Sequence, residues 1–385
     1  MNACLTEQEL RSLLDGGLTE AKMSSVGNHL VECDRCRQRA DDLTNVMELN
    51  WARGVRDHSS YSDVLVSQQL LEQSTKDKAA AGRSANSDLE HELDWLDPPR
   101  QAGDLGAMGA YRVLRVLGQG GMGIVLLCHE ETLDRLVAVK VLRSNRNDSR
   151  SRERFVREAR AAAAIQHDNV VTIHHVANPP DGPPYLVMQY IAGSTLRQQI
   201  GKVERLSTRE AARIAREIAN GLSAAHAAQL VHRDIKPANI ILDAADGRAK
   251  IMDFGLVRIT ALGKRARGSD VTQEGISPGT PEYMSPEQVD APQTVDARTD
   301  VYGLGVTLYE ILTGTPPFHG QAHAVLQQVL HDDPQLPHRR TPRIPRELET
   351  ICLHAMEKEP SGRYETAAAM AEDLHRLLNG EAILA

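Results

Sequence analysis

The sequence predicts an α+β fold in which a β-rich lobe precedes a helical lobe, with a small helical unit and a linker ahead of both. Apolar residues alternate in the strand-like runs YRVLRVL, GIVLLCHE, LVAVKVL and PYLVMQYI, all between residues 111 and 191. Helical periodicity follows in long runs at 207–229, 300–314 and 366–380. Because the strand-like runs come first, we expect the strands and the long helices to form two successive lobes.

Composition divides the chain into three parts. Residues 1–48 are predicted to form a small unit of two short helices. Residues 49–108 are rich in Ser, Asp, Gln, Ala and Gly, which indicates a mostly flexible linker in which Trp95 is a candidate for docking. Residues 109–380 contain the two lobes.

Charge and hydropathy exclude several classes of protein. The 385 residues carry a net charge of −8, so no basic surface is available to grip nucleic acid. No apolar run approaches the roughly 20 residues that span a bilayer, and the N-terminus lacks the pattern of a secretory signal. The five cysteines do not resemble an extracellular disulfide framework, because Cys128 and Cys352 are isolated in apolar runs. We therefore expect a cytoplasmic protein without a transmembrane segment.

The run LGQGGMGIV contains Gly118, Gly120 and Gly123, followed by Val125. The same glycine spacing opens dinucleotide-binding folds, but there a helix follows it. Here a β-favouring run follows, which predicts a glycine-rich hairpin whose backbone amides close over a polyphosphate. An ordinary hairpin turn is the alternative.

Lys140 ends the strand-like run LVAVK, and Glu158 lies on a predicted helix downstream. Taken alone, a lysine at this position is most often a surface residue with a buried stem. Together, a strand lysine and a helix glutamate can form an ion pair that holds the α- and β-phosphates of a nucleotide.

The run VHRDIKPANIILD concentrates the groups that phosphoryl transfer needs. Asp234 can orient a hydroxyl, Lys236 can compensate the charge of the transferred phosphoryl group, and Asn239 offers an amide oxygen to a divalent metal. Asp253 follows in Asp-Phe-Gly, and its carboxylate would complete a magnesium site.

From about Tyr111 to Leu378, the chain resembles eukaryotic-type protein kinases, close to the bacterial Ser/Thr group. The resemblance rests on an ordered set of motifs: the glycine loop, VAVK, HRDIKPAN, DFG and GTPEYMSPEQ. It implies a bilobal protein kinase fold and an enzyme that transfers the γ-phosphoryl group of ATP, with Mg²⁺ or Mn²⁺, to Ser/Thr hydroxyls of protein substrates.

The resemblance also implies roles for single residues. Lys140 and Glu158 would form the activating pair, Asp234 would be the catalytic base, and Lys236 would steady the γ-phosphate. Asn239 and Asp253 would hold magnesium.

Further positions match the nucleotide and substrate sites of the family. Met188 matches the gatekeeper, and residues 189–191 match the hinge that binds adenine through its backbone. Lys236 together with Thr280 resembles the Ser/Thr pattern rather than the tyrosine-specific one. Glu287 of Ser-Pro-Glu is expected to pair with Arg363.

Regulation is expected to involve the loop before Glu287. Arg233 beside the catalytic carboxylate implies control by loop phosphorylation, because the arginine needs a counter-anion. Thr272 resembles an autophosphorylated threonine of bacterial relatives, and Glu274 would supply permanent negative charge where those relatives have a second threonine. The alternative is that both are solvated loop residues. Asp300 is expected to brace the catalytic loop.

Near the N-terminus, HLVECDRC places His29, Cys33 and Cys36 on one helical face, and Cys4 can provide a fourth ligand. This arrangement resembles the zinc-binding domain of anti-sigma factors, which implies structural Zn²⁺ and a soluble regulator as partner. A redox pair without metal and unliganded buried thiols are the alternatives.

The competing prediction for the whole chain is a partner-binding scaffold in which the zinc module captures a regulator and the kinase fold is catalytically minor. Retention of Lys140, Asp234, Asn239 and Asp253 speaks against it, because a scaffold has no physical need for a complete set of metal ligands and a base. An activation dimer is a further candidate assembly.

Overall fold

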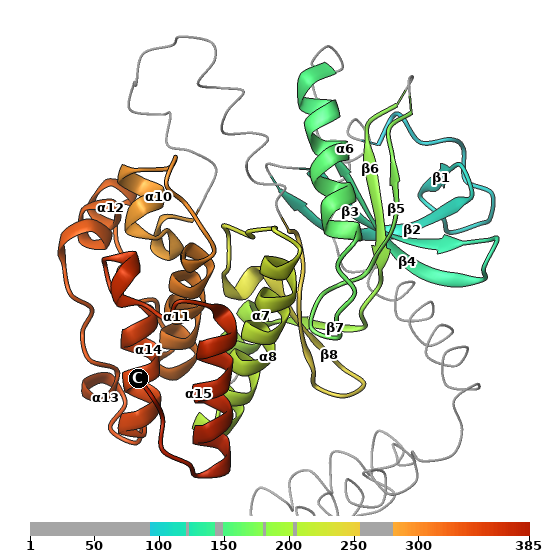
Figure 1. Cartoon of the computed structure of the whole chain (residues 1–385). Coiled ribbons are helices and arrows are strands. Elements are labelled where there is room, and N and C mark those ends of the chain that lie inside the picture. The colour runs from blue at the N-terminus through green and yellow to red at the C-terminus, as the bar shows by residue number, and fades with distance from the viewer. Residues whose placement is uncertain (1–92, 121–122, 143–148, 180–181, 203–205, 255–279) are drawn as a thin grey trace, which may run out of the picture. The chain divides into compact units, whose positions relative to one another are not determined.

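The computed structural model describes residues 93–120, 123–142, 149–179, 182–202, 206–254 and 280–385 (Figure 1). Several predicted residues lie outside these ranges, so their predictions stay open: Cys4, His29, Cys33, Cys36, Thr272 and Glu274.

An antiparallel six-stranded sheet with the order β1-β2-β3-β4-β6-β5 forms the first lobe. The strands are β1 (Gly106–Met108), β2 (Tyr111–Gly120), β3 (Gly123–Glu130), β4 (Arg135–Leu142), β5 (Ile173–Ala177) and β6 (Tyr185–Gln189). Helix α6 (Ser149–Ala163) lies beside β5 and β6 (Figure 1). Its Phe155 and Ala159 are buried against Leu186 of β6, as expected for an apolar helix stripe on a sheet.

The first lobe begins earlier than predicted. Residues 93–108 belong to the predicted linker, but β1 pairs with β2 along the edge of the sheet. Leu93, Trp95 and Leu96 pack against the apolar cluster formed by β2, β3 and β4. The docking suggested for Trp95 is therefore observed, and it extends the folded lobe to residue 93, because the outer face of the sheet needs an apolar cover.

The second lobe is helical. Its helices are α7 (Leu196–Lys202), α8 (Thr208–Ala227), α10 (Pro286–Asp290), α11 (Arg298–Thr313), α12 (Ala322–His331), α13 (Pro337–Arg340), α14 (Arg346–Ala355) and α15 (Ala367–Asn379), with the 3-10 turns η1 (Pro237–Asn239), η2 (Pro281–Tyr283) and η3 (Pro360–Gly362). Every residue from Thr299 to Thr313 is buried, so α11 is the central helix of this lobe. It packs against α8 and α14, while α15 lies along α8.

A small three-stranded sheet carries the loops that matter for chemistry. It consists of β7 (Gly193–Thr195), β8 (Ile240–Asp243) and β9 (Ala249–Ile251), in the order β7-β8-β9. The HRDIKPAN run enters β8, and Asp-Phe-Gly follows β9. Within the described ranges, no helix is both long and apolar enough to cross a membrane.

Candidate active site

The glycine-rich run forms an antiparallel hairpin between β2 and β3. Gly118 lies opposite Val125, and Gly120 lies opposite Gly123. Gly123 has φ +152°, and a Cβ there would lie 2.0 Å from the Val141 carbonyl oxygen, so only glycine fits. The predicted hairpin is confirmed, and a strand-to-helix turn of the dinucleotide-binding type is excluded.

An apolar cluster lies beside this hairpin. Ala138 of β4 pairs with Met188 of β6, and both belong to a buried cluster with Val171 and Ile191. Val125 of the hairpin packs against the same cluster. The predicted hairpin, gatekeeper and hinge positions are therefore brought together at one apolar surface.

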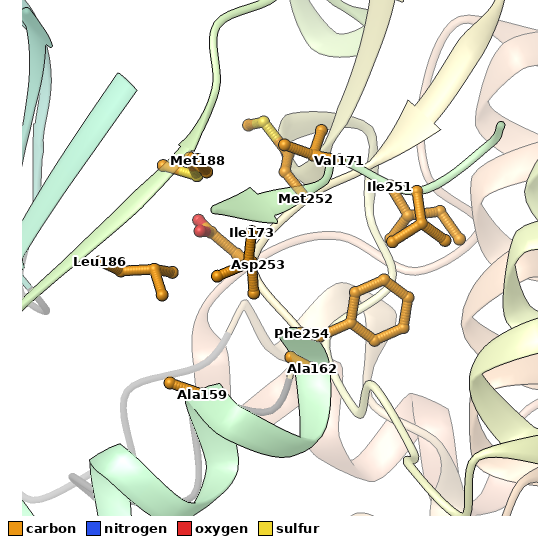
Figure 2. Close-up of a pocket in the computed structure, with 11 residues that line it drawn as sticks. Ala159, Ala162, Val171, Ile173, Leu186, Met188, Ile251, Met252, Asp253 and Phe254 are labelled. Atoms are coloured by element: carbon orange, nitrogen blue, oxygen red, sulfur yellow. The ribbon is translucent and has the colours of Figure 1, made fainter. Parts of the chain in front are cut away.

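An apolar pocket lies behind Met188 (Figure 2). Its walls come from α6, β5, β6 and the end of β9, and the side chain of Asp253 extends toward Leu186 and Met188 (Figure 2). The pocket therefore extends from the apolar cluster, through Val171 and Met188, to Asp253.

Lys140 lies inside the site rather than on the surface. It is only 5% exposed, and its Nζ lies 2.9 Å from Oδ1 of Asp253. This placement removes the surface-lysine alternative. Glu158 is half-buried on α6 next to Ala159, which lines the pocket of Figure 2. Its pairing with Lys140 stays a prediction.

The carboxylate of Asp234 is held by two neighbouring side chains. Asn239 Nδ2 donates to Oδ2 of Asp234 at 2.9 Å and to its carbonyl oxygen at 2.7 Å. Lys236 Nζ lies 2.9 Å from the same Oδ2 and donates to Oγ1 of Thr280 at 3.1 Å. Four sequence-predicted residues therefore converge, although Thr280 is distant from the others in sequence.

Asn239 and Asp253 approach each other through the β8–β9 pairing. Ile240 lies opposite Ile251, and the Met252 amide donates to the Asn239 carbonyl at 3.0 Å. Since the amide nitrogen of Asn239 is used on Asp234, its oxygen remains available as an acceptor.

An amide oxygen and a carboxylate are hard ligands that suit Mg²⁺, which takes its other ligands from phosphates and water. The donor set thus fits the predicted metal. No group of three or more His, Cys, Asp or Glu suited to a metal occurs in the described part of the chain.

Asp300 braces the backbone in front of Asp234. Its carboxylate is 1% exposed and accepts the amide hydrogens of His232 at 2.8 Å and Arg233 at 2.6 Å, with His226 Nε2 at 2.8 Å. The bracing contact expected for Asp300 is confirmed. These three contacts fix the start of the loop that carries Asp234 on the central helix of the second lobe.

His232 connects two parts of the site through its two ring nitrogens. The Asp234 amide donates to its Nδ1 at 3.2 Å, so Nδ1 carries no proton. Nε2 then carries the hydrogen and donates to the Met252 carbonyl at 2.9 Å. This histidine links the catalytic loop to the residue before Asp253.

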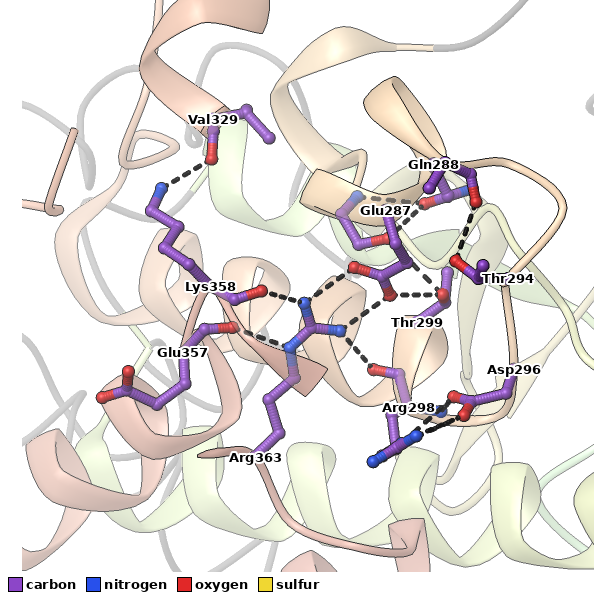
Figure 3. Close-up of polar contacts among 12 residues, drawn as sticks. Glu287, Gln288, Thr294, Asp296, Arg298, Thr299, Val329, Glu357, Lys358 and Arg363 are labelled. Atoms are coloured by element: carbon purple, nitrogen blue, oxygen red, sulfur yellow. Dashed lines mark hydrogen bonds and ion pairs between the residues drawn. The ribbon is translucent and has the colours of Figure 1, made fainter. Parts of the chain in front are cut away.

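The predicted pair of Glu287 and Arg363 is confirmed (Figure 3). Two parallel hydrogen bonds of 2.8 Å join the groups, and Thr299 Oγ1 donates to Glu287 Oε1 at 2.6 Å. Burial by itself raises the pKa of Glu287, but the hydrogen bonds from Arg363 and Thr299 outweigh it, and this pKa lies below its usual value.

Two polar clusters in the second lobe were not predicted. Arg197 contacts Tyr283 and Glu310, and Tyr283 donates to Glu310, which ties α7 and η2 to α11. Lys358 donates to the Val329 carbonyl at 2.7 Å (Figure 3), and burial lowers its pKa to about 8. Neither cluster has a sequence signal, because each joins residues from segments that are distant in sequence.

Comparison with known proteins agrees with this geometry. Residues 111–374 match the protein kinase domain family. The chain is 43% identical over 277 residues to the serine/threonine-protein kinase PknB of Mycolicibacterium smegmatis, covering 71% of this chain and 43% of that protein. It is 39% identical over 269 residues to the serine/threonine-protein kinase PrkC of Bacillus subtilis, covering 69% and 40%. It thus spans less than half the length of these relatives.

A solved structure agrees as well. The crystal structure of the Mycobacterium tuberculosis PknI kinase domain superimposes with a TM-score of 0.56 at 26% identity, covering 72% of this chain and 99% of that one. These similarities favour the kinase prediction over the scaffold alternative. The two described lobes form the bilobal kinase fold, and the chain belongs to the protein kinase domain family.

Proposed function

We propose that this protein is an active Ser/Thr protein kinase, which transfers the γ-phosphoryl group of ATP to Ser/Thr hydroxyls of protein substrates. The observation that carries the proposal is the carboxylate of Asp234, held by Asn239 and Lys236 while Lys236 also reaches Thr280. A positioned carboxylate beside a cation is what phosphoryl transfer requires of a protein.

ATP would bind between the glycine hairpin and the apolar cluster. The adenine would lie against Val125, Ala138 and Met188, with the backbone of residues 189–191 as its hydrogen-bonding partner. The amides near Gly118, Gly120 and Gly123 would approach the phosphates. Lys140 would bind the α- and β-phosphates, supported by Glu158.

Asn239 and Asp253 would hold Mg²⁺ or Mn²⁺, which neutralises phosphate charge when bound. Asp234 orients the substrate hydroxyl and takes its proton as the hydroxyl oxygen bonds to the γ-phosphorus. The bond from that phosphorus to the bridging oxygen breaks, and ADP leaves. Lys236 compensates the charge on the transferred group.

Substitution Asp234→Asn tests this proposal. The amide keeps the shape of the side chain but cannot accept the substrate proton, so we expect phosphate transfer from labelled ATP to casein to fall by about 100-fold or more. Asp296→Asn is the matched control, because Asp296 pairs with Arg298 and its side chain is 47% exposed. Equal labelling by wild type and Asp234→Asn contradicts the catalytic assignment.

Control of the enzyme would reside in the segment around Thr272. A phosphate on Thr272 would supply the counter-anion that Arg233 needs, and Glu274 would contribute permanent negative charge. Autophosphorylation is the expected source of the phosphate. Phosphopeptide mapping of the active protein is the measurement, and absence of phosphate on Thr272 would remove the proposal.

The segment 1–48 would be a zinc-binding module that docks a soluble cytoplasmic regulator. Its ligands would be Cys4, His29, Cys33 and Cys36, three of them on one helical face. Metal analysis of the purified full chain should find about one zinc per chain, and Cys4→Ser should lower that content. Zinc-free protein with an oxidisable Cys33/Cys36 pair would support the redox alternative instead. We also propose that two copies of the protein form a dimer during activation.

A further inference from the structure

The residue before the catalytic aspartate is held from two sides. Arg233 has φ +68°, a left-handed conformation that a non-glycine residue adopts only when its surroundings impose it. Its amide donates to Asp300 Oδ1 of α11 at 2.6 Å. Its carbonyl accepts a hydrogen bond from Nε2 of Gln288 at 2.8 Å. Side chains from two different helices therefore fix both backbone polar groups of this residue.

The amide of Gln288 has a single orientation that satisfies its contacts. Its Oε1 accepts the Ser285 amide hydrogen at 3.0 Å, while Nε2 faces the Arg233 carbonyl. A flipped amide would place an NH₂ group against the Ser285 N–H and an oxygen against the Arg233 carbonyl. One side chain thus caps the start of α10 and holds the catalytic loop.

The helix that carries Gln288 is itself anchored. The preceding residue, Glu287, makes the buried two-bond pair with Arg363. The position of Gln288 is therefore set by the core of the helical lobe, and it can act as a fixed support for the Arg233 carbonyl.

We propose that Gln288 is a positioning residue for Asp234, acting through the Arg233 carbonyl. It couples the end of the substrate-binding segment, from Thr280 to Glu287, to the catalytic loop. Loss of the Gln288 donor releases the restraint on the carbonyl of Arg233, which has a left-handed backbone conformation. The resulting backbone shift passes directly to Asp234, the next residue. The inference rests on the proposed kinase activity, in which displacement of a catalytic group by about 1 Å can cost about 100-fold in rate.

The variant Gln288→Glu isolates the donor. Its carboxylate keeps the size of the side chain and still accepts the Ser285 amide hydrogen, but it cannot donate to the Arg233 carbonyl. We expect kcat to fall by about 10-fold or more. KM for ATP should change by less than about twofold, because Gln288 is not part of the proposed ATP site.

The pH profile of Gln288→Glu separates positioning from a merely structural role. When the introduced carboxyl group is protonated it can donate again, so the activity relative to wild type should rise as pH falls from about 8 to about 6. Gln288→Leu, which removes both contacts without adding charge, should lose kcat similarly and show no such recovery. Because Gln288→Leu introduces no charge, a similar loss of kcat in this variant also shows that the loss in Gln288→Glu does not come from misfolding caused by the new charge.

Gln198→Glu is the matched control. Gln198 Oε1 accepts the Thr195 amide hydrogen at 2.9 Å at the start of α7, so the same exchange there should leave kcat unchanged. Wild-type kcat in Gln288→Glu, or a loss without recovery at lower pH, overturns the inference. Wild-type protein that transfers no phosphate overturns the proposed function instead, so the two failures are distinguishable.

Discussion

Arg363 illustrates how one buried side chain can organise a site that it does not touch. Besides Glu287, its guanidinium donates to the carbonyls of Glu357 and Lys358 at 2.7 and 2.8 Å and to that of Arg298 at 3.1 Å (Figure 3). Arginine suits this position because its planar group has donors in several fixed directions. The end of the segment from Thr280 to Glu287 is thereby held to α11 and to the loop before α15.

Glu287→Gln should destabilise the protein by about 3 kcal/mol near neutral pH, because the exchange leaves the buried guanidinium without its counter-charge. The pKa of Glu287 is lowered in the folded protein. The stabilisation that the ionised Glu287 carboxylate provides is therefore fully present above the usual glutamate pKa of about 4.3. This stabilisation is lost as pH falls through the lower pKa of the folded state.

Urea unfolding from about pH 7 downward measures this effect. The stability difference between wild type and Glu287→Gln should shrink at the acid end. Asp296→Asn, at a partly exposed ion pair, should cost at most about 1 kcal/mol. A pH-independent difference for Glu287→Gln would show that the ion pair does not cause it.

At the scale of elements, the stretch 93–108 is the main difference between expectation and structure. Strand β1 is three residues long, too short for its alternation to be recognised in the sequence. Beyond the strand, Asp104 pairs with Arg112 of β2 at 2.9 Å. The stretch therefore pairs with the outer edge of β2, the strand that carries part of the glycine hairpin, and shields β2 from pairing with other chains.

Trp95→Ala tests whether this stretch is part of the lobe. Trp95 is partly buried against the cluster of β2, β3 and β4, so its truncation should lower the free energy of unfolding by about 1 to 3 kcal/mol. Leu133→Ala is the control, because Leu133 is 62% exposed and should change stability by less than about 0.5 kcal/mol. If thermal unfolding finds that Trp95→Ala and Leu133→Ala change the stability equally, residues 93–108 are part of the linker and not of the lobe.

At the scale of the whole molecule, the site is assembled from both lobes and the small sheet. Lys140 comes from the first lobe, Asp234 and Asn239 from the loop before β8, and Thr280 from the segment that leads to α10. Their meeting depends on α11, whose Asp300 holds the catalytic loop from inside the helical lobe. Stability of the second lobe and geometry of the site are therefore linked.

Much of this arrangement could be predicted from the sequence. The strands β2, β3, β4 and β6 and the helices α8, α11 and α15 follow from periodicity, because each has a long apolar face. The short strands β5 and β7 could not be identified in this way. In β5, exposed His174 and His175 interrupt the alternation.

The sequence by itself determined which side chains are the candidates for the proposed chemistry. Motifs with fixed spacing specify Lys140, Asp234, Asn239 and Asp253, because phosphoryl transfer needs those side chains whatever surrounds them. Only the tertiary structure decided what holds them in place. The contact of Gln288 with Arg233 and the packing of Trp95 join segments that are distant in sequence, and no local pattern encodes such contacts because they depend on where whole elements pack.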